Sequence, residues 1–121
     1  MAISKYSVVE AGNLGLGQAG SIFLDTGTLP SSPPTGTVFV AITFLDDTTF
    51  DSSGGLIAED ANQYANTQAE AHNESDGSET TTQGSGGLQI DVSNTFPAGV
   101  TIFGRWTEIN LDAGLIIAYI G

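Results

Sequence analysis

The sequence predicts an all-β protein, either a compact antiparallel sandwich or a jelly-roll-like barrel. Short runs of β-branched and aromatic residues alternate with turns rich in glycine, proline, aspartate and asparagine along most of the 121 residues. No long segment has the apolar spacing of a strongly amphipathic helix. Because 40% of the residues are hydrophobic, the chain can pack a core, although a domain this short buries only about two thirds of its unfolded surface.

The first 36 residues are expected to form an N-terminal arm with two short strands, at 6–9 and 21–24. Four glycines lie between these strands, and no helical pattern follows them, so a permissive loop is favoured over a phosphate-binding loop. The tripeptide Asp25-Thr26-Gly27 matches a motif of aspartic proteases. The prolines that follow it do not supply the flap and apolar surroundings of such an enzyme, so we interpret it as a turn.

Residues 37–121 are expected to form the β-domain. Segment 37–45 has two apolar faces, which predicts a strand buried on both sides. Asp46 and Asp47 close this strand, and residues 48–50 open the return strand of a hairpin. After a turn at 51–55, residues 56–58 form another short strand.

A long polar segment covers residues 59–87. Alanines near helical spacing predict one or two turns of helix around 59–71. The second half is rich in glycine, serine and threonine and has no period. We therefore expect a long loop exposed to solvent, with a short helix as its one regular element.

The C-terminal third returns to strands. Residues 88–93 alternate between apolar and polar, as in a sheet with one solvated face, and 94–99 form a turn. Residues 100–111 predict a long strand in which Gly104 marks a bulge or a close approach of the backbone. Residues 115–120 are continuously apolar, so this strand is expected to be covered on both faces, in the sheet centre or by another subunit.

The charge excludes several classes of function. Two Lys and Arg residues, Lys5 and Arg105, stand against 14 Asp and Glu, for a net charge of −12. Nucleic acids and anionic membranes are therefore not expected as partners. Without cysteine, neither disulfides nor a thiolate metal site can supplement the core. The chain also lacks an apolar run typical of a signal peptide or a spanning helix, which predicts synthesis in a cytoplasm.

Two parts of the sequence resemble small virion proteins of tailed bacteriophages. These are the sequence Phe-Gly-Arg-Trp-Thr at 103–107 and the apolar C-terminal strand at 116–120. The similarity extends over roughly residues 37–121 and includes the stretch Asp-Gly-Ser-Glu-Thr at 76–80. It implies a capsid decoration, or cement, protein that binds the major capsid protein on the capsid exterior, commonly as a homotrimer. The alternative is a phage knob, fibre or tail adhesion module whose 59–87 loop meets a host receptor or glycan.

Candidate interface residues combine the one tryptophan, a cation and the apolar end of the chain. They are Arg105, Trp106, Phe103, Leu115, Ile116, Ile117 and Tyr119. For Arg105 and Trp106 the alternative is an internal ion pair and a core tryptophan. No set of residues combines a nucleophile, a base and an orienting group, so no enzymatic activity and no cofactor are expected.

The acidic residues are weak candidates for a cation site. Asp46, Asp47 and Asp51 lie in oxygen-rich turns of the kind that can hold Ca²⁺. Their spacing fits no EF-hand, so a solvated acidic surface is the favoured interpretation and no metal site is predicted.

Overall fold

The computed structural model describes residues 19–26, 30–70, 72–74, 76–78 and 80–121. Within these residues the protein is all-β, without a helix, and its antiparallel sheets pack as a compact sandwich. The prediction of a sandwich is confirmed, and no closed barrel forms. The strand expected at 6–9 lies outside the described residues, as does Gly27 of the expected Asp-Thr-Gly turn.

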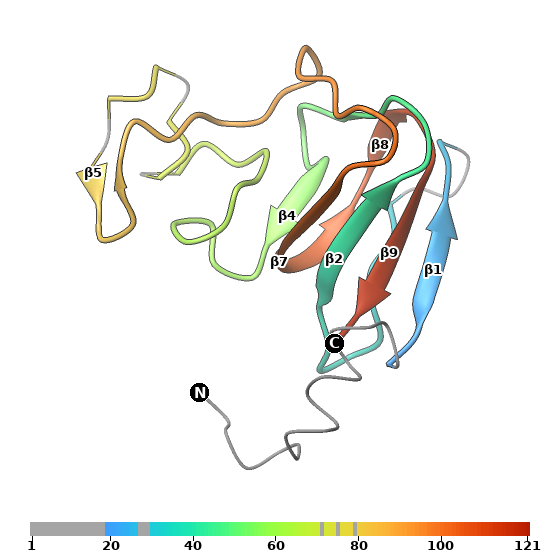
Figure 1. Ribbon diagram of the computed structural model, residues 1–121. Helices are drawn as coiled ribbons and strands as arrows, with labels where there is room; N and C mark the ends of the chain where they lie inside the picture. The colour runs from blue at the N-terminus through green and yellow to red at the C-terminus, as the bar shows by residue number, and fades with distance from the viewer. Residues whose placement is uncertain (1–18, 27–29, 71, 75, 79) are drawn as a thin grey trace.

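The larger sheet contains five antiparallel strands in the order β1-β9-β2-β7-β4, seen side by side in Figure 1. They are β1 (Ser21–Leu24), β9 (Ile116–Ile120), β2 (Phe39–Phe44), β7 (Thr101–Ile109) and β4 (Leu56–Ala58). All five fall where the sequence predicts strands. β1 belongs to the range expected as an arm, and it forms one edge of the sheet by pairing with β9.

The smaller sheet pairs β3 (Thr49–Phe50) with β8 (Leu111–Ala113). The predicted hairpin between residues 37–45 and 48–50 is therefore wrong, since β3 leaves the large sheet. The crossing begins at Thr48, which is fully buried and exchanges two backbone hydrogen bonds with Phe96. These bonds direct the chain away from β2 and toward the second layer.

The core lies between the two layers and is dominated by one face of the large sheet. Phe44 on β2 packs against Phe50 on β3 with ring centroids 6.0 Å apart. Phe96, from the connection before β7, stacks on Phe44 at 5.0 Å and meets Phe50 edge-on at 5.4 Å. This aromatic cluster joins three segments that are far apart in sequence, and each of its pairs adds to the stabilisation from burial alone.

β2 and β9 are covered on one face within the chain, whereas the sequence predicts burial on both. On β9, Ile116, Ala118 and Ile120 are buried, and the alternate residues Ile117 and Tyr119 are partly exposed. On β2, Ile42 is buried and Thr43 is partly exposed, although the small Ala41 on the same side as Thr43 is also buried. The small second layer covers one side of the sheet, so the opposite side has no second layer among the described residues.

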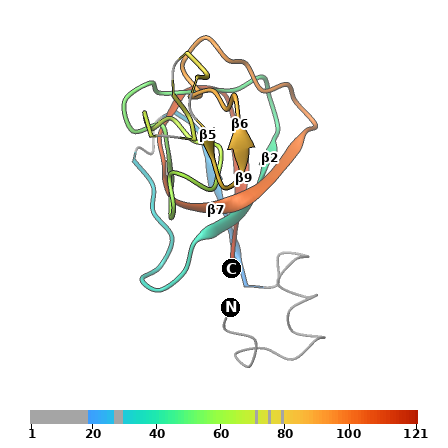
Figure 2. The ribbon, with the colours of Figure 1, turned by 90° about the vertical axis from the view of Figure 1, so that its left-hand side faces the viewer.

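Gly104 lies at a close approach of the backbone, as predicted. The register between β2 and β7 shifts at this point, because Ala41 pairs with Phe103 and Phe39 with Trp106. A Cβ at Gly104 would lie 2.7 Å from Cζ2 of the Trp106 ring. The glycine therefore lets the tryptophan fold back against its own strand. Figure 2 shows β7 curving across the molecule.

The strand predicted at 88–93 does not form. Asp91 accepts hydrogen bonds from the backbone N–H of Ser93, and its own N–H donates to the side chain of Asn94. Such local side-chain bonds compete with a strand ladder and turn the chain instead. Leu88 and Val92 are consequently exposed, and Ile90 alone of the three packs against the core.

The short helix predicted around 59–71 is also wrong for the residues described there. One turn begins, with Gln63 and Tyr64 donating backbone N–H groups to the carbonyl of Asp60. The carbonyls of Ala61 and Tyr64 then accept from the side-chain amides of Asn66 and Asn73. Because side chains take these acceptors, an i to i+4 ladder cannot continue.

The rest of the polar segment includes a small hairpin of β5 (Thr80–Thr81) and β6 (Gly84–Ser85), which is largely exposed. Its first half is anchored, in contrast to the exposed loop expected for 59–87, because Asn66, Thr67 and Asn73 are buried. Among the described residues, no helix is both long and apolar enough to cross a membrane.

Candidate functional site

The feature that stands out on the surface is the uncovered side of the five-stranded sheet, which we call the outer face. Strand register places one row of side chains from Phe23 through Ile117 and Thr43 to Thr101. A second row runs from Ser21 through Tyr119 and Ala41 to Phe103. Leu45 and Leu115 extend the face beyond the strand ends, where the N–H of Leu45 donates to the carbonyl of Leu115 at 2.8 Å.

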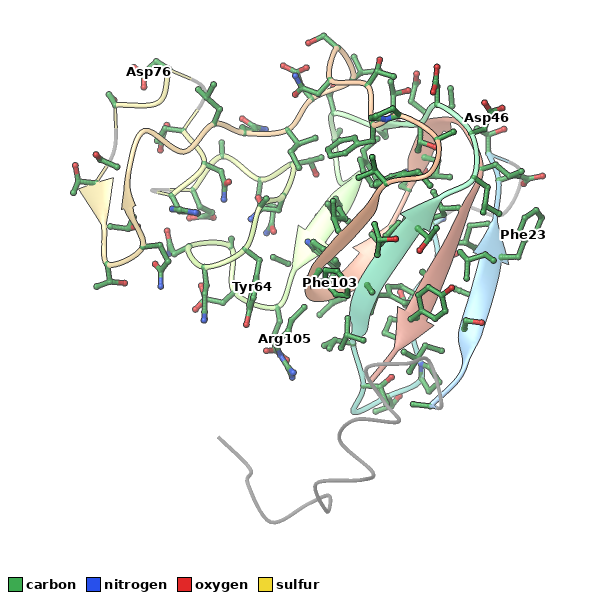
Figure 3. All side chains as sticks on the ribbon, in the orientation of Figure 1. Phe23, Asp46, Tyr64, Asp76, Phe103 and Arg105 are labelled. Carbon is green, nitrogen blue, oxygen red and sulfur yellow. The ribbon has the colours of Figure 1, made fainter. Side chains whose placement is uncertain are left out.

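Large apolar side chains on the outer face are open to solvent. Phe103 is 73% exposed and Phe23 is 59% exposed, and Leu45 is also exposed. Ile117 and Tyr119 lie partly buried between them. Figure 3 shows Phe23 at the β1 edge and Phe103 on β7. Several large exposed apolar side chains on one face of a sheet mark an interaction site more often than isolated exposed residues do.

None of the eight residues in these rows is charged, nor is Leu45 or Leu115, although the chain has a net charge of −12. Acidic groups lie at one end of the face, where Asp25 follows β1 and Asp46 and Asp47 follow Leu45, all of them exposed. The outer face is thus uncharged and mostly apolar, with the hydroxyl groups of Ser21, Thr43 and Thr101 among its side chains and an acidic rim at one end. A partner that contacts both would combine an apolar patch with basic groups at its border.

Arg105 lies two residues beyond Phe103 and makes a bidentate ion pair with Glu59. Its Nε donates to Oε1 of Glu59 at 2.7 Å, and its Nη2 donates to Oε2 at 3.1 Å. These hydrogen bonds lower the pKa of Glu59 and raise the pKa of Arg105. Both side chains are nearly half exposed, so solvent screens the pair and its contribution to stability is small.

The structure divides the interface residues predicted from the sequence between two environments. Phe103, Leu115, Ile117 and Tyr119 share the outer face, and the Arg105 ion pair lies beside it. Two others are buried in the core: Trp106 is 1% exposed and Ile116 is fully buried.

Trp106 has the environment of a core tryptophan, which is the alternative that the sequence left open. Its indole N–H donates to the carbonyl of Ala65 at 2.9 Å, so the ring joins β7 to the polar segment. As long as the fold is intact, neither Trp106 nor Ile116 presents its side chain to a partner.

The chain matches no protein-family model, no curated protein sequence and no solved structure.

The three aspartates considered for Ca²⁺ accept hydrogen bonds from backbone N–H groups. Asp46 accepts from the N–H of Asp47, and Asp51 accepts from the N–H of Ser53, both at 2.8 Å. Asp47 accepts from the N–H of Ala98 at 3.2 Å. Within the described residues, no three acidic or histidine side chains converge as metal ligands would.

Sequence reasoning missed Phe23 and Leu45 as surface residues. Both belong to apolar runs, and an apolar run does not indicate which of its alternating faces is covered. Placing them on the same face as Phe103 requires the register between strands, which the sequence does not supply.

Proposed function

We propose that the protein is a structural protein of a bacteriophage virion that binds the outside of the capsid head through its outer face, as a decoration or cement protein. The observation that carries the proposal is the exposed, uncharged apolar surface around Phe103, Ile117 and Tyr119. The resemblance of residues 37–121 to phage virion proteins supplies the class of partner, the major capsid protein.

The distribution of charge supports a role outside a shell. Fourteen acidic residues keep the free protein soluble, and the apolar surface is confined to a face that a partner can cover. Cement activity needs no catalytic group. It requires a rigid surface that touches neighbouring capsid subunits at once, and a sheet of five paired strands provides such rigidity.

Binding to heads assembled without the protein tests this proposal. Wild-type protein should co-sediment with such heads, and Phe103→Asp should bind more than about tenfold more weakly, because it would bury an unpaired carboxylate. The matched control is Leu88→Asp, which alters a 60% exposed leucine outside the outer face and should bind as wild type does.

Localisation on purified particles separates cement from the alternative function. Many copies on heads support the proposal. Confinement to a knob, a fibre or a tail would favour the adhesion module, and absence from virions would refute both. Equal loss of binding in the Phe103 and Leu88 variants would also refute the outer face as the docking surface.

A further inference from the structure

One edge of the large sheet carries unused backbone hydrogen-bonding groups. The N–H of Ile120 donates to the carbonyl of Gly20 at 2.9 Å, and bonded positions alternate along an antiparallel ladder. Ile22 and Leu24 therefore bond to β9, while the backbone groups of Ser21 and Phe23 point away from the sheet. In the structure as described, no hydrogen bond reaches these outward groups.

The opposite edge of the sheet is closed by the chain itself. The carbonyl of Leu56 on β4 accepts a hydrogen bond from the N–H of Thr67, and the N–H of Leu56 donates to the Thr67 hydroxyl, both at 3.0 Å. The N–H of Ala58 donates to the side-chain carbonyl of Gln68 at 3.0 Å. The Thr67 N–H, the Thr67 hydroxyl and the Gln68 side-chain carbonyl thus satisfy these outward backbone groups of β4. A strand from another chain therefore cannot pair with this edge.

β1 has none of the features that protect an exposed edge. Its sequence, Ser-Ile-Phe-Leu at 21–24, contains no lysine, no proline and no inward-pointing charge, and its register against β9 has no bulge. Natural monomers protect edge strands with such devices because an open edge pairs with other strands. A closed edge at β4 and an unprotected edge at β1 indicate that β1 is covered by another strand.

We propose that β1 pairs antiparallel with β1 of a second copy of this chain, across a twofold axis at Ile22. In this register Ser21 lies opposite the partner's Phe23, and each pair exchanges two N–H to carbonyl bonds. The outward N–H and carbonyl groups of Ser21 and Phe23 in each copy are then all hydrogen-bonded. The two five-stranded sheets become continuous, as expected for an isologous contact.

The positions of the charges allow a second copy as the occupant. The register sets Asp25 opposite the partner's Ala19, and the two Asp25 residues lie six positions apart along the paired strands. That separation is roughly 20 Å at about 3.3 Å per residue, well beyond the Debye length of about 8 Å at physiological salt. Two strongly acidic chains can therefore meet along this edge without placing carboxylates opposite each other.

The contact also extends the outer face from one copy to the next. Phe23 would lie beside the partner's Ser21, which neighbours the partner's Tyr119 on the same face. A dimer would present two apolar surfaces on one side of a continuous sheet. The pairing is twofold, so it predicts a dimer rather than the homotrimer that the sequence resemblance implies, and it stands whether or not the protein binds capsids.

Molar mass and amide exchange of the full-length protein test the pairing. At about 200 µM, light scattering should give twice the monomer mass of 12.4 kDa, and dilution to about 1 µM should give monomer, because four residues make a small contact. The amides of Ser21 and Phe23 should exchange at least about tenfold more slowly at the higher concentration.

Phe23→Pro should abolish the dimer, since proline removes an outward N–H that β9 does not use. Leu88→Ala is the control: it removes a side chain that is 60% exposed, against 59% for Phe23, and that lies away from the edge and the outer face, and it should leave the dimer intact. A wild-type monomer or trimer at about 200 µM would overturn the proposal. So would concentration-independent protection of the Ser21 and Phe23 amides, which would mean that the chain covers its own edge. The exchange measurement needs no variant, so it decides the matter even where Phe23→Pro fails to fold.

Discussion

Replacing Gly104 with alanine should destabilise the protein through one identifiable contact, the Trp106 ring. The added Cβ would lie 2.7 Å from Cζ2 and 2.9 Å from Cη2 of that ring. Carbon atoms pack at about 3.5–4.0 Å, so the ring or the strand must move by roughly 1 Å. The ring is 1% exposed and its N–H is bonded to Ala65, so movement in either direction disturbs the core.

The expected change in the free energy of unfolding combines two destabilising contributions and one stabilising contribution. Overpacking a core costs about 1–3 kcal/mol, and weakening the buried indole hydrogen bond costs about 0.5–1.5 kcal/mol. Replacing glycine by alanine restricts the unfolded chain and returns about 0.4–1 kcal/mol. The net loss in the free energy of unfolding should be about 0.5–4 kcal/mol, which corresponds to a melting temperature lower by roughly 2–16 °C.

A double-mutant cycle measured by urea unfolding isolates the contact. The phenyl ring of Trp106→Phe lacks the two carbons that the new Cβ would meet, so Gly104→Ala should cost less than about 0.5 kcal/mol in that background. An equal cost in both backgrounds would show that alanine acts through the backbone at the register shift and not through the ring. A wild-type-like free energy of unfolding for Gly104→Ala alone would refute the close approach itself.

Three further predictions concern the polar groups. Arg105→Ala should lower the free energy of unfolding by less than about 1 kcal/mol, because its pair with Glu59 is screened by solvent. In the same variant the pKa of Glu59, measured by NMR titration, should rise from its lowered folded value. Because that pKa is lowered on folding, the small stabilisation is present above the pKa of Glu59 in the unfolded chain and is lost as the pH falls through its pKa in the folded protein. A folded pKa of Glu59 unchanged by Arg105→Ala would show that Arg105 does not cause the lowering. Thr67→Val should cost about 1–3 kcal/mol in urea unfolding, because it leaves the buried N–H of Leu56 without a partner, and an unchanged midpoint would mean that this edge is not closed by Thr67. Adding a chelator should leave the melting temperature unchanged, and a drop would reveal a bound cation that stabilises the fold.

Most strands were predictable because their signal is local. The segments that become β1, β2, β4, β7 and β9 combine β-branched or aromatic residues with turn residues at both ends. In two places where prediction failed, side-chain hydrogen bonds opposed the local signal. Asp91 turns the chain inside an alternating pattern, and Asn66 and Asn73 take the carbonyls that a helix at 59–71 would need.

The candidate surface was predictable in part. Phe103, Ile117 and Tyr119 were named from the apolar C-terminal region and a conspicuous aromatic, and they share the outer face. Trp106 and Ile116 were named on the same grounds, yet they are buried. Side chains adjacent in sequence point to opposite faces of a strand, so residue type alone cannot separate the two groups.

The amino-acid sequence by itself determined the all-β class, the approximate position of the main strands and the acidic character of the protein, because periodicity, turn chemistry and charge are properties of neighbouring residues. Only the tertiary structure decided which face of β2 and β9 is covered, that β3 pairs with β8, and which edge of the sheet remains open. Those outcomes depend on contacts between residues far apart in the chain. The second layer covers one side of the large sheet, so an apolar strand that looks buried in sequence has its other side partly exposed.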